Sequence, residues 1–114
     1  MMYQVEISSV AEAEADQAFL WMAQQISQEA AKQWYQGLLQ AIESLAKMPR
    51  RCPLAPENSA FSVEIRQLLY GKGRGKYRVI FTIVEDANSL TIRILHIRHS
   101  AKQRLNDSSL DETN

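Results

Sequence analysis

Cysteine, histidine and long apolar runs are scarce in this sequence, which holds one cysteine and two histidines in 114 residues. A lone cysteine forms no internal disulfide and fits a reducing compartment. No apolar run approaches the roughly 20 residues that span a bilayer, and the N-terminus lacks the basic and apolar regions of a secretory signal. We therefore expect a cytoplasmic protein that makes no membrane contact and holds no cofactor.

Net charge is also absent, but the charges are unevenly distributed along the chain. Residues 1–61 carry four basic and seven acidic side chains, and residues 62–105 carry nine basic and three acidic ones. A basic half indicates a surface for a polyanion or an acidic protein segment, although lysine and arginine also protect exposed strands from pairing. The length suits one domain. We assign it to residues 1–105 and expect the polar, acidic residues 106–114 to form a disordered tail.

Apolar periodicity predicts one strand followed by two helices. Residues 2–8 alternate as a strand, and Ser9 and Glu12 have the spacing of a capping box at a helix start. Ser27 is placed to cap a second helix, which ends before Pro49. The apolar stripe of the first helix is Ala15, Ala18, Phe19, Met22 and Ile26. That of the second is Ala31, Trp34, Tyr35, Leu38, Ala41, Ile42 and Leu45.

The second half of the chain predicts three strands. Residues 49–61 hold all three prolines and indicate an extended surface connection. Period-two patterns over 62–70, 76–84 and 90–98 then predict an antiparallel meander. The fold class is α+β, with a helical hairpin packed on one face of a small, mainly antiparallel sheet. Trp34, Leu38, Ile42 and Leu45 are expected to pack against Tyr77, Val79, Phe81 and Ile83.

The last strand is apolar on both predicted faces, with Ile92 and Ile94 on one and Leu95 and Ile97 on the other. A strand covered on only one side should alternate between apolar and polar residues. Two explanations remain open. Either the last strands lie at the centre of the sheet with cover on both sides, or one face awaits a partner.

Glycines alternate with Lys72, Arg74 and Lys76 in the segment 71–76. The glycine spacing is no nucleotide fingerprint, because that motif needs a helix after it and here a strand follows. The loop either wraps a phosphate backbone or is a soluble hairpin turn.

Arg78 lies in the middle of a strand among apolar residues, which is costly unless it pairs or faces a groove. Two interpretations stay open, an ion pair with Glu64 or an acid of the tail, and a functional role. Arg93 and Arg98 are an odd number of residues apart, so regular alternation puts them on different faces.

His96 and His99 are too few for a metal site, because no third ligand lies at a useful spacing. Alternation also places them on opposite faces of a strand. His96 is expected to be a packed core histidine, and His99 is the better acid–base candidate. Cys52 follows an arginine, which would lower the pKa of its thiol, but an unreactive loop cysteine is the simpler interpretation.

Six segments follow one another at a characteristic spacing, and together they resemble the RelE/ParE toxin superfamily over residues 3–105. The segments are Trp34 to Leu38, Ser44 to Pro49, Arg51 to Glu57, Ile65 to Leu68, Tyr77 to Phe81 and Leu95 to His99. The resemblance implies a β-α-α-β-β-β fold and the toxin role in a type II toxin–antitoxin, or plasmid-stabilisation, module. It also implies a cognate antitoxin that wraps the toxin, and growth arrest when the toxin is free.

Two mechanisms occur in this superfamily. RelE-like members resemble ribosome-dependent mRNA endoribonucleases, and there the resemblance gives Arg78 the role of catalytic arginine, Arg98 that of a second cation and His99 that of acid or base. However, no tyrosine follows His99, where several RelE-like enzymes carry one. ParE-like members resemble poisons of DNA gyrase, and the loop Arg51 to Glu57 leans towards them. We favour the ParE-like interpretation, with the ribonuclease and an inactive antitoxin-binding module as alternatives.

Six basic side chains are expected to form the surface for a partner or for nucleic acid. They are Lys72, Arg74, Lys76, Arg93, Lys102 and Arg104. The expected partners are the antitoxin and either DNA gyrase or the ribosome with its mRNA, and a homodimer stays open.

Overall fold

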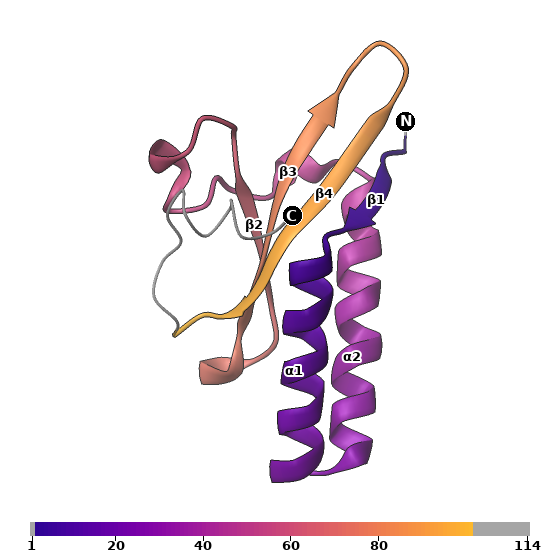
Figure 1. Cartoon of the computed structure of the whole chain (residues 1–114), viewed down its shortest axis with the longest axis vertical. Helices are drawn as coiled ribbons and strands as arrows, with labels where there is room; N and C mark the ends of the chain where they lie inside the picture. Colours follow the sequence, from indigo (N-terminus) through magenta and orange to yellow (C-terminus); the bar gives the residue numbers. More distant parts are fainter. Residues whose placement is uncertain (1, 102–114) are drawn as a thin grey trace.

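Two helices and four strands make up the computed structural model, which describes residues 2–101 (Figure 1). In chain order they are β1 (Gln4–Ile7), α1 (Ser9–Gln25), α2 (Gln28–Glu43), β2 (Arg66–Tyr70), β3 (Tyr77–Glu85) and β4 (Leu90–His99). The predicted element order and the α+β class are confirmed. None of the helices within these residues is long and apolar enough to cross a membrane.

The sheet has the strand order β1-β4-β3-β2, so the first and last strands of the chain are neighbours. β1 pairs with β4 in parallel, from Gln4 opposite Thr91 to Ile7 opposite Ile94. The β3 strand pairs with both β4 and β2 in antiparallel fashion. The sheet is therefore mixed, with β3 and β4 at its centre.

Serine caps start both helices, but the first cap is not the predicted one. The Oγ atom of Ser8, not Ser9, accepts the N–H of Ala11 at 3.0 Å. Ser8 is fixed there because its N–H donates to the Ile94 carbonyl at 3.0 Å as β1 ends, so the helix begins one residue earlier than expected. Ser27 caps α2 as predicted, accepting the N–H of Ala30 at 3.0 Å.

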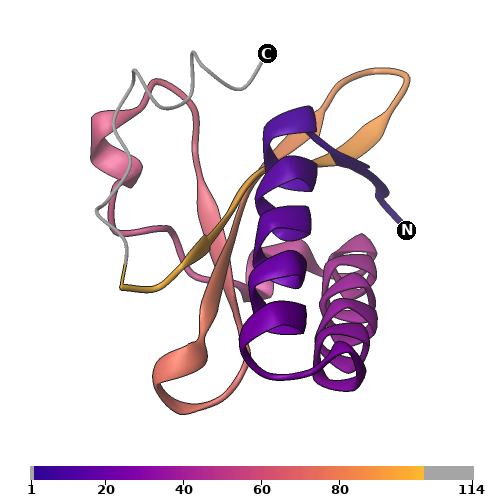
Figure 2. The same ribbon diagram turned by 60° about the horizontal axis from the view of Figure 1, so that its bottom comes forward.

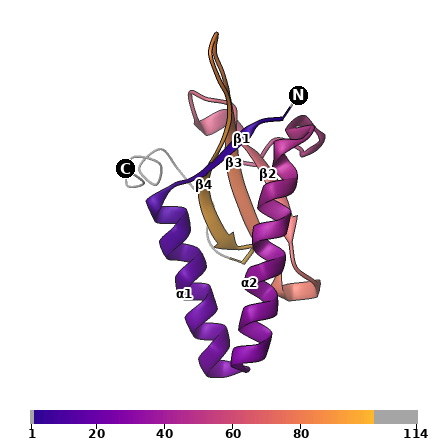
Figure 3. The same cartoon turned by 90° about the vertical axis from the view of Figure 1, so that its right-hand side faces the viewer.

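The main core lies between the helical hairpin and the sheet, and both helices run across the same face (Figure 3). The predicted packing of the α2 stripe on β3 is confirmed. Its buried members are Leu38, Ile42, Leu45, Val79 and Phe81, with Trp34, Tyr77 and Ile83 packed against them. The prediction for Ile26 is wrong. It is 64% exposed, because it lies just past the end of α1 in the connection between the helices.

The other face of the sheet is covered by the segment between α2 and β2 (Figure 2). Ala55 and Ile65 of this segment pack with Ile80 and Leu95 of the central strands. Arg66 fixes the segment by donating to the Cys52 carbonyl at 2.6 Å. The predicted surface connection over 49–61 is thus a packed layer with short 3-10 turns, and central strands under cover on both sides explain their apolar faces.

A β-bulge in β4 changes which residues share a face. Phe81 lies opposite Ile94 and Ile80 lies opposite His96, so Leu95 is an extra residue between them. Ile97 consequently joins the core on the helix side. The prediction that Ile97 shares a face with Leu95 is therefore wrong.

Candidate functional site

Arg78 is buried, with 7% of its surface exposed, and two nitrogens of its guanidinium donate hydrogen bonds to neighbouring side chains. Nη2 donates to Oε1 of Glu57 at 2.5 Å, and Nε donates to Oε1 of Gln67 at 2.8 Å. Glu57 is itself only 5% exposed. An ion pair was one of the two interpretations of Arg78, with Glu64 or an acid of the tail as its partner. The pair is present, but its partner is Glu57, and Glu64 pairs with Arg66 at 3.0 Å. The pair joins the covering segment to the centre of the sheet.

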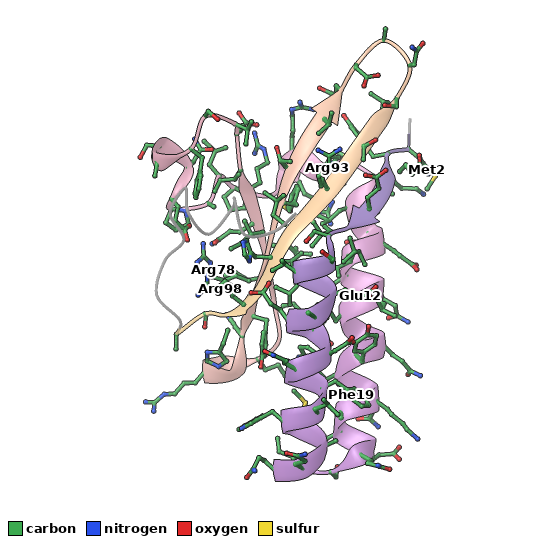
Figure 4. All side chains as sticks on the ribbon, viewed as in Figure 1. Met2, Glu12, Phe19, Arg78, Arg93 and Arg98 are labelled. Atoms are coloured by element: carbon green, nitrogen blue, oxygen red, sulfur yellow. The ribbon has the colours of Figure 1, made fainter. Side chains whose placement is uncertain are left out.

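Arg98 lies directly opposite Arg78 on the neighbouring strand (Figure 4). Arg93 lies opposite Thr82, which has the same parity on β3 as Arg78. Arg93 and Arg98 therefore share the face away from the helices, contrary to the prediction, because the bulge between them shifts the alternation. The Nε atom of Arg98 is buried without a hydrogen-bond partner within residues 2–101.

His99 lies on the opposite face from Arg78 and Arg98. It pairs with Tyr77 across the strands, and the two rings meet edge to face with centroids 5.2 Å apart. Its Nδ1 atom accepts the N–H of Ala101 at 3.0 Å. The three residues assigned to a ribonuclease are thus divided between two faces of the sheet.

Glu14 was not singled out from the sequence, yet it joins α1 to the edge of β4. Its carboxylate accepts the N–H of Ile97 at 3.0 Å and lies 3.2 Å from Nδ1 of His96. Because β1 ends at Ile7, this edge of β4 has no strand partner beyond Ile94 within residues 2–101, and the Glu14 carboxylate accepts the Ile97 N–H in place of a strand. The sequence feature that could have revealed Glu14 is its position as a lone acid on the helix face that carries the buried Ala11, Ala15 and Ala18.

A pocket of about 320 Å³ lies between α1 and the end of β4. Residues of its wall include Glu14, Ala18 and Trp21 from the helix and Ile97, Arg98 and His99 from the strand. Its apolar wall and the exposed tryptophan suit an aromatic or apolar group, and Arg98 and Glu14 place one charge of each sign on the wall.

The predicted basic loop is a tight turn next to this pocket. Gly71 and Gly73 adopt positive φ values of 112° and 56°. Lys72 and Arg74 are exposed, and the Lys76 carbonyl accepts the N–H of Ser100 at 2.9 Å. The turn is therefore held beside the end of β4. Lys102 and Arg104 lie outside the described residues.

Metal and thiol chemistry find no support in residues 2–101. No group of three or more histidine, cysteine or carboxylate side chains in this part of the chain is arranged to hold a metal ion. Cys52 is buried, and desolvation raises the pKa of its thiol despite the opposing effect of Arg51 and Arg66. A raised thiol pKa disfavours the nucleophilic thiolate.

Comparisons with known proteins place these features in context. A family model described as the ParE toxin of the type II toxin–antitoxin system, parDE, matches residues 5–104. The solved structure titled "Chromosomal ParDE TA system from P. aeruginosa" has a TM-score of 0.67 and 19% sequence identity, covering 86% of this chain and 96% of that chain. At this identity the structural likeness shows a shared fold. No curated protein matches the chain.

Proposed function

Because the chain belongs to the ParE toxin family of type II toxin–antitoxin systems, we propose that it halts growth by acting on DNA gyrase. It does so in the cytoplasm and without cleaving nucleic acid itself. A cognate antitoxin holds it inactive, and loss of that antitoxin releases it. This is the ParE-like mechanism expected from the loop Arg51 to Glu57.

The state of Arg78 is the observation that carries the non-enzymatic mechanism. Stabilising a phosphorane requires a cation that can reach the substrate, whereas the guanidinium of Arg78 is buried between Glu57 and Gln67. His99, the acid–base candidate, lies on the other face of the sheet. These positions favour a structural role for Arg78 and weaken the ribonuclease alternative.

The basic half of the chain and the exposed apolar residues around it support an antitoxin surface. Arg93 is half-exposed on β4, 3.8 Å from Glu6, and Leu54 and Leu69 are exposed near the edge of β2. An antitoxin segment that combines acidic and apolar side chains would complement both kinds of group.

Two assays on the purified full chain test the mechanism. We expect inhibited supercoiling and accumulation of cleaved DNA when gyrase is present, and intact mRNA when programmed ribosomes are present. His99→Gln should poison gyrase as well as the wild type does. In cells, co-expression of the neighbouring gene should relieve the arrest.

His99→Gln is a cleaner test than Arg78→Ala, because losing Arg78 also breaks a buried ion pair that holds the fold. Ribosome-dependent mRNA cuts by the wild type that disappear in His99→Gln would contradict the gyrase mechanism. Unchanged supercoiling at saturating protein would contradict it too.

A further inference from the structure

Four basic side chains at one end of the sheet have no acidic partner within residues 2–101, namely Lys72, Arg74, Lys76 and Arg98. Most other cations are occupied. Arg50, Arg66, Arg78 and Arg93 each form an ion pair, and Arg51 donates to three carbonyls after α2. Lys32 and Lys47 also lack acidic partners, but they lie singly on α2 and after it. Uncompensated positive charge is therefore concentrated where β3 begins and β4 ends.

Backbone pairing holds these cations close to one another. Arg98 lies opposite Arg78 on β3, and Arg78 follows Lys76 by two residues. The Ser100 N–H also donates to the Lys76 carbonyl at 2.9 Å. The loop between β2 and β3 is closed by the Gly75 N–H donating to the Lys72 carbonyl at 3.1 Å. The turn that carries Lys72, Arg74 and Lys76 is thus held beside the end of β4, which carries Arg98.

Trp21 adds an aromatic platform beside Arg98. It is 56% exposed, while every other phenylalanine, tyrosine and tryptophan of the chain is at least half-buried. It lines the pocket between α1 and β4 together with Arg98 and His99. Exposing so large an apolar ring costs hydrophobic free energy, which a partner that covers the ring would recover.

We propose that Lys72, Arg74, Lys76, Arg98 and Trp21 form a binding surface for single-stranded DNA. The cations contact successive phosphates, and one base stacks on Trp21 beside Arg98. Basic side chains interleaved with an aromatic platform are the usual means of binding single strands without sequence preference. The choice of DNA rests on the proposed function, since a protein that acts on gyrase meets its DNA. The surface, which we term the Trp21 surface, would let the toxin contact gyrase and DNA together.

An acidic peptide would also neutralise the four cations, but it fits the Trp21 surface less well. Lys72 and Arg74 are exposed on the turn, and Arg98 at the end of β4 lines the same pocket as the exposed ring of Trp21. That arrangement matches the regular repeat of phosphates and bases.

Fluorescence anisotropy of a labelled oligo(dT) of roughly 12 nucleotides tests the proposal with the full chain. We expect the association constant to fall as salt rises. In a plot of its logarithm against the logarithm of salt concentration, each cation that contacts a phosphate should contribute about 0.7 to the slope. The double variant Lys72→Gln/Arg74→Gln should reduce that slope by about 1.4. Lys32→Gln/Lys47→Gln removes the same charge from α2 and the turn after it, and should leave the slope unchanged. Circular dichroism confirms that each variant is folded.

Trp21 variants separate stacking from charge. Trp21→Ala should weaken binding roughly 5- to 150-fold at constant salt slope, and Trp21→Phe should restore most of the affinity. Bound oligonucleotide should also quench the fluorescence of exposed Trp21. This quenching should be absent in Trp21→Phe, where only the half-buried Trp34 remains.

Several results would overturn the Trp21 surface as a DNA site. They are no binding by oligo(dT), equal losses in the Lys32→Gln/Lys47→Gln control, a tenfold preference for oligo(rU), and competition by polyglutamate with no oligonucleotide bound. Wild-type protein that poisons gyrase but binds no oligonucleotide would refute this inference and leave the proposed function standing. Oligonucleotide binding without any effect on gyrase would support the Trp21 surface and contradict the proposed function.

Discussion

Gly37 occupies the middle of α2, where glycine costs about 1 kcal/mol relative to alanine. Tyr70 explains its presence. The Tyr70 hydroxyl donates to the Trp34 carbonyl at 2.7 Å, and a Cβ atom on residue 37 would lie 2.2 Å from that hydroxyl oxygen. The glycine therefore makes room for the hydrogen bond that joins the end of β2 to α2.

Gly37→Ala should destabilise the protein by about 1–3 kcal/mol, because the new methyl group displaces Tyr70. In a Tyr70→Phe background the hydroxyl is gone and the nearest ring carbon lies 3.2 Å away. There the same substitution should be nearly neutral or stabilise by up to about 1 kcal/mol through helix propensity. Urea denaturation of the four proteins measures this. Equal effects in both backgrounds would show that Tyr70 is not the cause.

The hairpin of β3 and β4 is anchored at its tip by Glu85. Nη2 of Arg50 donates to Oε1 of Glu85 at 2.7 Å, and the Tyr3 hydroxyl donates to Oε2 at 2.5 Å. The hydrogen bonds from Arg50, and then that from Tyr3, hold the pKa of Glu85 below its ordinary value of 4.5. A carboxylate with a lowered pKa stabilises the fold above its unfolded pKa and stops doing so as the pH falls through the folded value.

Glu85→Gln should therefore lower the denaturation midpoint at pH 7, and the difference from wild type should shrink as the pH falls below about 4.5. Arg50→Met, which removes the main partner and keeps the carboxylate, should give the same pH dependence. Urea midpoints between pH 7 and pH 3 supply the measurement. A difference that stays constant with pH would mean that the Glu85 contacts contribute no pH-dependent stability.

Regular elements could be predicted from the sequence, but the bulge in β4 could not. Leu38 and Ile42 recur at a helical spacing that predicts the buried face of α2, and Leu45 in the 3-10 turn after the helix continues that face. Leu95 instead extends an apolar run that looks alike with or without an extra residue. Since one residue of slip exchanges the two faces of a strand, Ile97 was assigned to the wrong face.

Apolar periodicity also could not predict which side chains pair with Arg78 and with the edge of β4. The cost of burying Arg78 predicts an acid nearby, but Glu57 lies in a segment without a repeat, and only the path of that segment brings it within reach. Glu14 was hidden for a related reason. It caps the edge of β4, and that need arises only because β1 is short.

The whole molecule has three layers, with the helical hairpin, the sheet and the segment before β2 stacked in that order (Figures 2 and 3). Most of the buried apolar side chains lie between the hairpin and the sheet. Stability should accordingly depend on the buried face of α2 far more than on its outer face.

Leu38→Ala and Leu39→Ala compare the two faces of α2 at adjacent positions. Leu38 is fully buried and Leu39 is exposed. Leu38→Ala should cost about 2–5 kcal/mol, and Leu39→Ala less than about 1 kcal/mol. Both are measured as unfolding free energies from urea titrations with unchanged slopes. Similar losses at the two positions would mean that the hairpin is packed differently.

The pairing of β1 with β4 has a consequence for how the protein is made. β4 lies between β1 and β3, so until β4 has left the ribosome β1 has no strand partner and β2 and β3 can form only a two-stranded hairpin. Domains generally fold as units as they are synthesised, and this one can do so only at the end. A message cut before codon 90 would yield a chain without its central strand. The toxin fold is therefore completed only after β4 has emerged, late in the synthesis of the described residues.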